Sequence, residues 1–215
     1  MGVVFDKLLG EPLLHSHPVS SPSLLIRLNP PTLSGHYDYG GWLTDSNMTV
    51  NLVQGLLRHQ PFYVAQETTY SAIAIKVGTK SSTVNAVCRL GIYNNNNGAP
   101  GNLVVDAGTF NIYTTNGVVE LPINVTLKPG LYFTCIVTNG TGATVYAVGS
   151  ATQGIQMIPP IAIVSAGTTF DGVGMAGCFA KSGQESIAVN GLPSTAIYDT
   201  MYNLTNVAAF GLKIA

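Results

Sequence analysis

The fold class is decided by one stretch of the chain, Leu127-Lys128-Pro129-Gly130-Leu131-Tyr132-Phe133-Thr134-Cys135-Ile136-Val137. Its first part is typical of a turn, because proline presets φ and the glycine that follows accepts a positive φ. From Leu131 to Val137 every second residue is apolar and faces one way, which is the period of a β-strand. The stretch therefore predicts a turn that leads into a strand.

The same pattern extends outward in both directions. Residues 73–77 and 88–92 alternate with a period of two, and residues 139–142 form a turn before a further strand at 143–148. Residues 94–101 are predicted to be a loop, since Asn and Gly tolerate positive φ. Further strands are predicted at residues 103–105, 109–113, 118–127 and 207–215. Turns recur about every 8–12 residues, which predicts an all-β fold, an antiparallel, jelly-roll-like β-sandwich.

Two segments leave the secondary structure open. Residues 47–58 fit a helix with an apolar stripe at Met48, Leu52 and Leu56, but they fit a strand nearly as well. Residues 153–205 are rich in Gly, Ser and Ala, which favours long loops or edge strands over the sheets.

The first thirty-five residues differ from the rest. Five prolines interrupt apolar patches there, so that no helix of useful length fits, and the segment is too apolar for a solvated linker. It should lie extended, either on its own domain or as an attachment peptide on other subunits. We expect an extended N-terminal arm at residues 1–35 and a β-sandwich domain at residues 36–215.

Composition narrows the classes of function. Of the 215 residues, 46% are hydrophobic and only 9% are charged, and the net charge is −1. These values exclude a disordered solvating tail and give no basic surface for nucleic acid. No apolar run is long enough for membrane insertion, and the first residues lack the features of a signal peptide. The three scattered cysteines indicate buried thiols rather than disulfides or a zinc site.

Catalytic motifs are scarce. The chain has no GxSxG, P-loop, HExxH or paired Cys/His spacing. Asp106 and Asp171 could approach each other in a sandwich, but carboxylates beside turns usually cap them. Cys88, Arg89 and Cys135 are read as strand residues, with the cysteines inward and the arginine on the opposite face. We expect no enzymatic activity.

Candidate binding residues come from exposed aromatic and amide side chains. Tyr39 and Trp42 stand beside glycines, where aromatic rings can stack on a sugar face or simply seat the first loop on the core. Asparagine amides offer both donors and acceptors to sugar hydroxyls. The receptor-binding candidates are Tyr39, Trp42, Asn94, Asn95, Asn96, Asn97 and Asn139.

His15 and His17 form the candidate metal site. Residues two apart in an extended chain point to the same side. If three chains meet at a three-fold axis, six imidazoles converge and could hold a divalent transition metal. The alternative is that both histidines are ordinary contacts of a docking peptide, and no other cofactor is expected.

Several stretches resemble a known family. Residues 89–93, 98–109 and 127–132 are similar to a β-sandwich module of tailed-bacteriophage virion proteins, common in tail-fibre, baseplate and head-fibre proteins. Residues 61–75 fit the opening strands of that module. Residues 7–17 resemble attachment stretches of phage fibres, which often carry His-x-His.

This resemblance implies a structural protein of the virion, assembled in the cytoplasm of a bacterial host. The first hypothesis is a homotrimeric tail or baseplate fibre or adhesin, attached to other virion proteins through residues 1–35 and binding a host-surface glycan or protein. The alternative is a capsid decoration protein, of the cement or head-fibre type, that stabilises the head. A depolymerase is a weaker hypothesis, because it typically needs a longer chain and an acidic pair in a groove. A lectin-like module outside any virus is a further, weaker hypothesis.

Overall fold

The structure is a computed structural model that describes residues 34–40, 48–148, 176–203 and 207–215. Of the predicted arm, all but Ser34 and Gly35 lie outside the described residues, so the proposed boundary between arm and domain stays a prediction.

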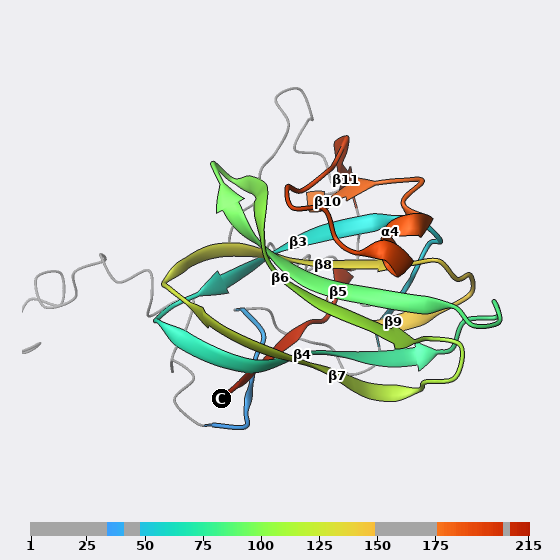
Figure 1. Cartoon of the computed structure of the whole chain (residues 1–215), viewed down its shortest axis with the longest axis horizontal. Coiled ribbons are helices and arrows are strands. Elements are labelled where there is room, and N and C mark those ends of the chain that lie inside the picture. Colours follow the sequence, from blue (N-terminus) through green and yellow to red (C-terminus); the bar gives the residue numbers. More distant parts are fainter. Residues whose placement is uncertain (1–33, 41–47, 149–175, 204–206) are drawn as a thin grey trace, which may run out of the picture. The chain divides into compact units, whose positions relative to one another are not determined.

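The described chain is almost entirely antiparallel β-structure in two sheets (Figure 1). The first sheet runs in the order β1-β13-β4-β9-β12, with β2 paired to β9 and β7 to β4, and the second runs β11-β10-β3-β8-β5-β6. The strands are β1 Tyr37–Asp38, β2 Thr49–Asn51, β3 Leu57–Val64, β4 Thr68–Thr79, β5 Val87–Asn96, β6 Ala99–Asn111, β7 Gly117–Leu127, β8 Gly130–Thr138, β9 Thr144–Val148, β10 Ala176–Lys181, β11 Thr200–Asn203, β12 Val207–Ala208 and β13 Gly211–Ile214, and helix α4 is Glu185–Asn190.

Eight consecutive strands, β2 to β9, have the connections of a jelly roll. Four of them pair as β2-β9-β4-β7 in the first sheet, and the other four pair as β3-β8-β5-β6 in the second. With the eight strands counted from one, these orders are 1-8-3-6 and 2-7-4-5, the two interleaved Greek keys of that fold. The predicted all-β, jelly-roll-like sandwich is therefore confirmed, with β1 and β10–β13 added to its two sheets.

The main core lies between the two sheets. It is filled by inward side chains of both, and its largest fully buried members include Phe62, Tyr70, Ile73, Leu90, Ile92, Ile136 and Leu212. Burial of this much apolar surface, at roughly 25 cal/mol per Å², is the dominant force that holds the sheets together.

A second, smaller core covers the outer face of the β3-β8-β5 sheet. Leu57, Tyr93, Phe133 and Cys135 pack there under Ala188 of α4 and its neighbours. Both faces of this sheet are buried, which explains why β8 is buried from Phe133 to Thr138 instead of alternating. In Figure 1, α4 and the segment after it lie over these strands.

The expectation that Cys88 and Cys135 both face inward, opposite Arg89, is wrong for Cys135. Cys88 belongs to the core between the sheets, but Cys135 pairs with Gly91 and so shares the outer face with Arg89. Because α4 covers that face, an apolar thiol is as well buried there as between the sheets.

Where the structure describes them, the two segments of undecided secondary structure now have assigned elements. Within residues 48–58 the chain forms strand β2 and the start of β3, not a helix, and the turn between them places Gly55 at φ 67°. Residues 176–203 contain β10, helix α4 and β11. The helix differs from the expectation of loops or edge strands in this segment. The strand predicted at residues 207–215 is split into β12 and β13, which pair with different neighbours.

Candidate functional site

The asparagine run forms the end of the β5–β6 hairpin. Asn94, Asn95 and Asn96 are the last residues of β5, and Asn97-Gly98 is a two-residue turn with φ values of 52° and 89°. An Asn-Gly pair with positive φ at both positions suits the right-handed twist of a hairpin. The prediction of a loop over residues 94–101 is therefore wrong, because β5 and β6 stay paired up to Asn96 and Ala99.

A polar recess of about 290 Å³ lies beside this hairpin. One wall comes from the hairpin and the other from the segment after α4. The lining residues are Asn94, Asn95, Asn96, Pro100, Gly101, Asn102, Thr195, Ala196 and Tyr198. The predicted candidates Asn94, Asn95 and Asn96 therefore lie together in one concave site.

The second wall is fixed by backbone hydrogen bonds to the edge of β6. The N–H of Leu103 donates to the carbonyl of Ser194 at 2.8 Å, and the N–H of Ala196 donates to the carbonyl of Gly101 at 2.7 Å. Between them Thr195 forms a single antiparallel bridge with Asn102. Because these contacts are made by the main chain, the recess keeps its width without a ligand.

The asparagine amides are oriented by the hairpin itself. Asn94 Oδ1 accepts from the N–H of Asn102 at 2.6 Å, and Asn95 Oδ1 accepts from the N–H of Gly98 at 2.8 Å. Each side chain therefore keeps its Nδ2 donors for other partners. Within the described part of the chain the amide of Asn96 makes no hydrogen bond. The recess thus presents several N–H donors to a ligand.

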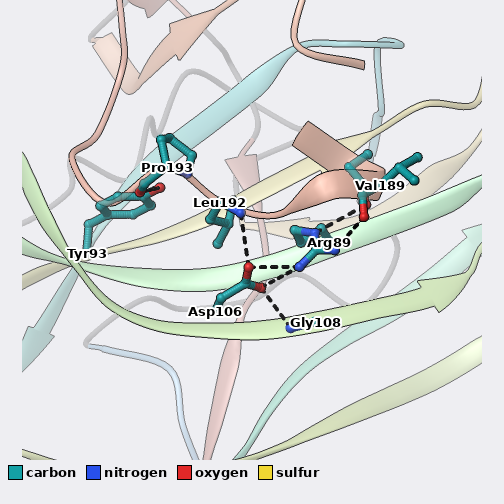
Figure 2. A network of polar contacts seen from close by, with 8 residues as sticks. Arg89, Tyr93, Asp106, Gly108, Val189, Leu192 and Pro193 are labelled. Carbon is teal, nitrogen blue, oxygen red and sulfur yellow. Dashed lines mark hydrogen bonds and ion pairs between the residues drawn. The ribbon is translucent and has the colours of Figure 1, made fainter. Parts of the chain in front are cut away.

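Behind the recess, Arg89 and Asp106 form a partly buried ion pair between β5 and β6 (Figure 2). Arg89 Nη1 donates to both carboxylate oxygens of Asp106, at 2.9 and 2.8 Å. The remaining guanidinium donors reach α4, where Nε bonds the carbonyl of Ala188 and Nη2 that of Val189. One arginine therefore joins two strands to the C-terminal end of the helix.

Asp106 also receives two backbone hydrogen bonds. Its Oδ2 accepts from the N–H of Leu192 at 3.0 Å, and its Oδ1 accepts from the N–H of Gly108 at 2.9 Å. Burial opposes ionisation of this carboxyl, but these two bonds and Arg89 outweigh it and lower the pKa of Asp106. The carboxylate is thus ionised and anchors the chain as it leaves α4.

Two buried ring side chains hold the next residues of the wall. The Tyr93 hydroxyl donates to the carbonyl of Pro193 at 2.9 Å, and His59 Nε2 lies 3.3 Å from the carbonyl of Ile197. The two rings meet edge to face, with centroids 4.9 Å apart. Burial lowers the pKa of His59 to about 4, so the ring is neutral at pH 7 and its Nε2–H can donate.

Tyr39 and Asn139 do not belong to this recess. Tyr39 is 40% exposed and follows β1 in the first sheet. Asn139 lies at the other end of β5, about 30 Å along the strand from the asparagine turn, and its Oδ1 accepts from the N–H of Val87 at 2.8 Å. That contact gives Asn139 a role in the structure of its turn.

Trp42, His15, His17 and Asp171 lie outside the described residues. Within the residues that are described, no three His, Cys, Asp or Glu side chains gather as a metal site, and no helix is long and apolar enough to cross a membrane. The metal site at His15 and His17 stays a prediction.

Sequence reasoning found the asparagines but missed the residues that form and fix the opposite wall of the recess. Arg89 was read as an outward strand residue and Asp106 as a turn cap, while Thr195 and Tyr198 fell in the segment left open. One signal was present: an arginine in an apolar strand needs a partner, and Asp106 is one of only ten acidic residues.

Comparison with known proteins gives no match to this chain, either among protein-family models or among curated proteins.

Proposed function

We propose that this chain is a structural component of a bacteriophage virion, a tail or baseplate fibre or adhesin that binds the host surface through the recess beside the β5–β6 hairpin. The observation that carries the proposal is that both walls of this recess are fixed before any ligand binds. A preorganised site loses less conformational entropy on binding, which favours affinity.

The chemistry of the recess suits a carbohydrate. Asn94, Asn95 and Asn96 offer amide donors to sugar hydroxyls, and the ring of Tyr198 at the margin offers an apolar face. Tyr198 is itself held by edge-to-face contact with Phe179, at a centroid distance of 5.0 Å. The occupant we propose is a glycan of the host surface.

The fold and the sequence support the proposed function by analogy. Jelly rolls occur in viral capsid proteins and in lectins, although a fold alone does not define a function. The resemblance of residues 89–93, 98–109 and 127–132 to phage virion modules adds to this analogy. In the proposed particle the chain is a homotrimer, and residues 1–35 attach it to other virion proteins.

The alternative is a capsid decoration protein, in which the same hairpin would contact neighbouring capsomers. Electron microscopy of particles labelled with an antibody against this chain separates the two. Label on the tail or baseplate supports the adhesin, and label over the whole head overturns it in favour of the decoration protein.

Adsorption tests the recess directly. Particles that carry Asn96→Ala should adsorb to host cells several-fold more slowly, because a donor without an internal partner is removed. Asn116→Ala, in the turn before β7, removes an exposed asparagine outside the recess and is the matched control. Equal adsorption of both variants would contradict the proposal.

A further inference from the structure

A second recess, of about 220 Å³, lies on the outer face of the first sheet. It shares no residue with the asparagine recess. Three tyrosines, Tyr37, Tyr39 and Tyr146, line it together with Lys76 and Val118. Apart from Ile75, the remaining lining residues are small: Ala74, Ala147, Ala209 and Gly211. The hollow therefore has aromatic side chains at its sides and mostly small residues at its floor.

The floor is created by a change of neighbour along β4. On the side of β4 away from β7, Ala74 pairs with Gly211 of β13, whereas Val77 pairs with Val145 of β9. The residues between these two pairs lie where one partner strand has ended and the next begins. The chain crosses from β12 to β13 at this point, which leaves a hollow in the sheet surface.

Tyr37 forms a fixed wall of this hollow. It lies across Gly211, where a Cβ would come within 3.0 Å of its Cδ1. Its hydroxyl donates to Glu120 of β7, and this hydrogen bond, followed by burial, raises the pKa of Tyr37 to about 12. Tyr39 is adjacent, with ring centroids 6.4 Å apart. The two ring planes are tilted by 47°, so the rings form an aromatic corner in which the Tyr37 ring is held in place.

Lys76 supplies a charge at the opposite wall. Its Nζ lies 4.0 Å from the centroid of the Tyr146 ring. Lys181 and Lys213 are paired with Asp199 and Glu120, but Lys76 has no carboxylate partner among the residues that the structure describes. Glu120 is balanced by Lys213, and among the described residues that line the hollow Lys76 is the charged one.

We propose that this hollow binds a pyranose that carries a carboxylate group. The apolar face of the sugar ring stacks on Tyr37 and Tyr39, and the carboxylate pairs with Lys76. Aromatic rings supply area with little entropy to lose, and the cation selects the acidic sugar over its neutral counterpart. The inference rests on the proposed function, because it gives the host-surface glycan a chemical class and a second contact point.

The test uses the purified full chain and two probes that differ only at C6, methyl glucuronide and methyl glucoside, with binding followed by NMR titration. Both should bind weakly, with dissociation constants on the order of millimolar. The glucuronide should bind about threefold to fivefold more tightly, which is what an exposed ion pair supplies. Added salt should remove this preference.

Single substitutions test which side chains contact the sugar. Lys76→Met keeps the alkyl chain over Tyr146 and should abolish the preference for the glucuronide, whereas Lys80→Met, an exposed lysine just after β4, should retain it. Tyr39→Ala should weaken both probes about tenfold. Tyr39 is exposed enough that this change should leave the thermal transition in place.

The inference is overturned if neither probe binds at about 50 mM, if the glucoside binds as tightly as the glucuronide, or if Lys76→Met keeps the preference. Adsorption separates this failure from failure of the proposed function. Slow adsorption of Asn96→Ala particles with no binding of either probe would leave the adhesin and reject this site. Selective binding of the glucuronide with normal adsorption of both Asn96→Ala and Lys76→Met particles would support the site and reject the adhesin.

Discussion

The side chain of Asn94 lies over the α-carbon of Gly101, so closely that a Cβ at residue 101 would be 2.4 Å from Asn94 Oδ1. The same oxygen accepts the N–H of Asn102. The side chain of Asn94 can therefore reach the backbone of β6 only because residue 101 has no Cβ. This contact gives the asparagine recess its shape, and it leads to the first prediction.

Gly101→Ala should displace Asn94 and destabilise the hairpin by about 1–3 kcal/mol, the usual effect of overpacking. Hydrogen exchange of the Asn102 amide should become faster, since its acceptor moves away. Asn94→Ala in the Gly101→Ala background removes the closest clash and leaves only that with the Cβ of Asn96 at 2.9 Å, so the two changes should be less than additive in urea unfolding. Full additivity would show that the two residues do not interact.

Arg89→Met should lower the free energy of unfolding by about 2 kcal/mol, because Asp106 loses its charged partner and two α4 carbonyls lose their donor. Lys181→Met is the control, since it breaks an ion pair whose side chains are 33% and 60% exposed. That change should cost less than about 0.5 kcal/mol. Urea unfolding at pH 7 measures both, and equal losses would contradict the anchoring role of Arg89.

The lowered pKa of the buried His59 predicts that the folded protein loses stability in mild acid. Its pKa of about 4 in the folded protein lies below the ordinary histidine pKa of 6.5. Between these values the unfolded chain takes up a proton that the folded chain does not, so stability falls as pH drops from 6.5 to 4. The total loss is roughly 3 kcal/mol.

Thermal unfolding across this pH range provides the measurement. His59→Gln can still donate to Ile197 but does not titrate, so its curve should be flatter than that of the natural protein. His36→Gln, at an exposed position, is the matched control. If His59→Gln followed the same pH profile as the natural chain, the histidine would not be the cause.

Deletion of residues 1–33 should leave the jelly roll folded, because the described residues of its two cores already fill the space between and over the sheets. The cut is placed before Gly35, whose N–H donates to the carbonyl of Ile214, and before His36, whose carbonyl accepts from Ile214. The truncated chain should keep a cooperative thermal transition but should not enter particles. Normal incorporation would contradict the proposed attachment role.

The sandwich was predictable because its signals are local. The turn at residues 128–130 leads into β8 as expected, and the period of two in β4 and β5 correctly separates inward from outward residues. Alternation requires only that one face meet a core, and a single chain shows that pattern directly. The strands and the antiparallel sandwich were therefore within reach of the sequence, whereas pairs such as β2 with β9 are as distant in the chain as the two walls of the recess.

The recess was only partly predictable. The asparagines were found because four consecutive polar residues stand out, but their pairing as strand ends depends on the Asn97-Gly98 turn. The opposite wall, at Thr195 and Tyr198, is about a hundred residues away and is placed by Arg89, Asp106 and Tyr93. Contacts at such separation leave no periodic trace in one sequence.

The bridge between Asn102 and Thr195 has a consequence for how the chain meets other copies of itself. β6 is the last strand of its sheet, and a bare strand edge of thirteen residues would be a template for pairing with a neighbouring copy. The segment after α4 occupies that edge near the hairpin, and three register shifts against β5 bend the rest. In the proposed particle, where copies of the chain would stand close together, this edge would resist edge-to-edge aggregation.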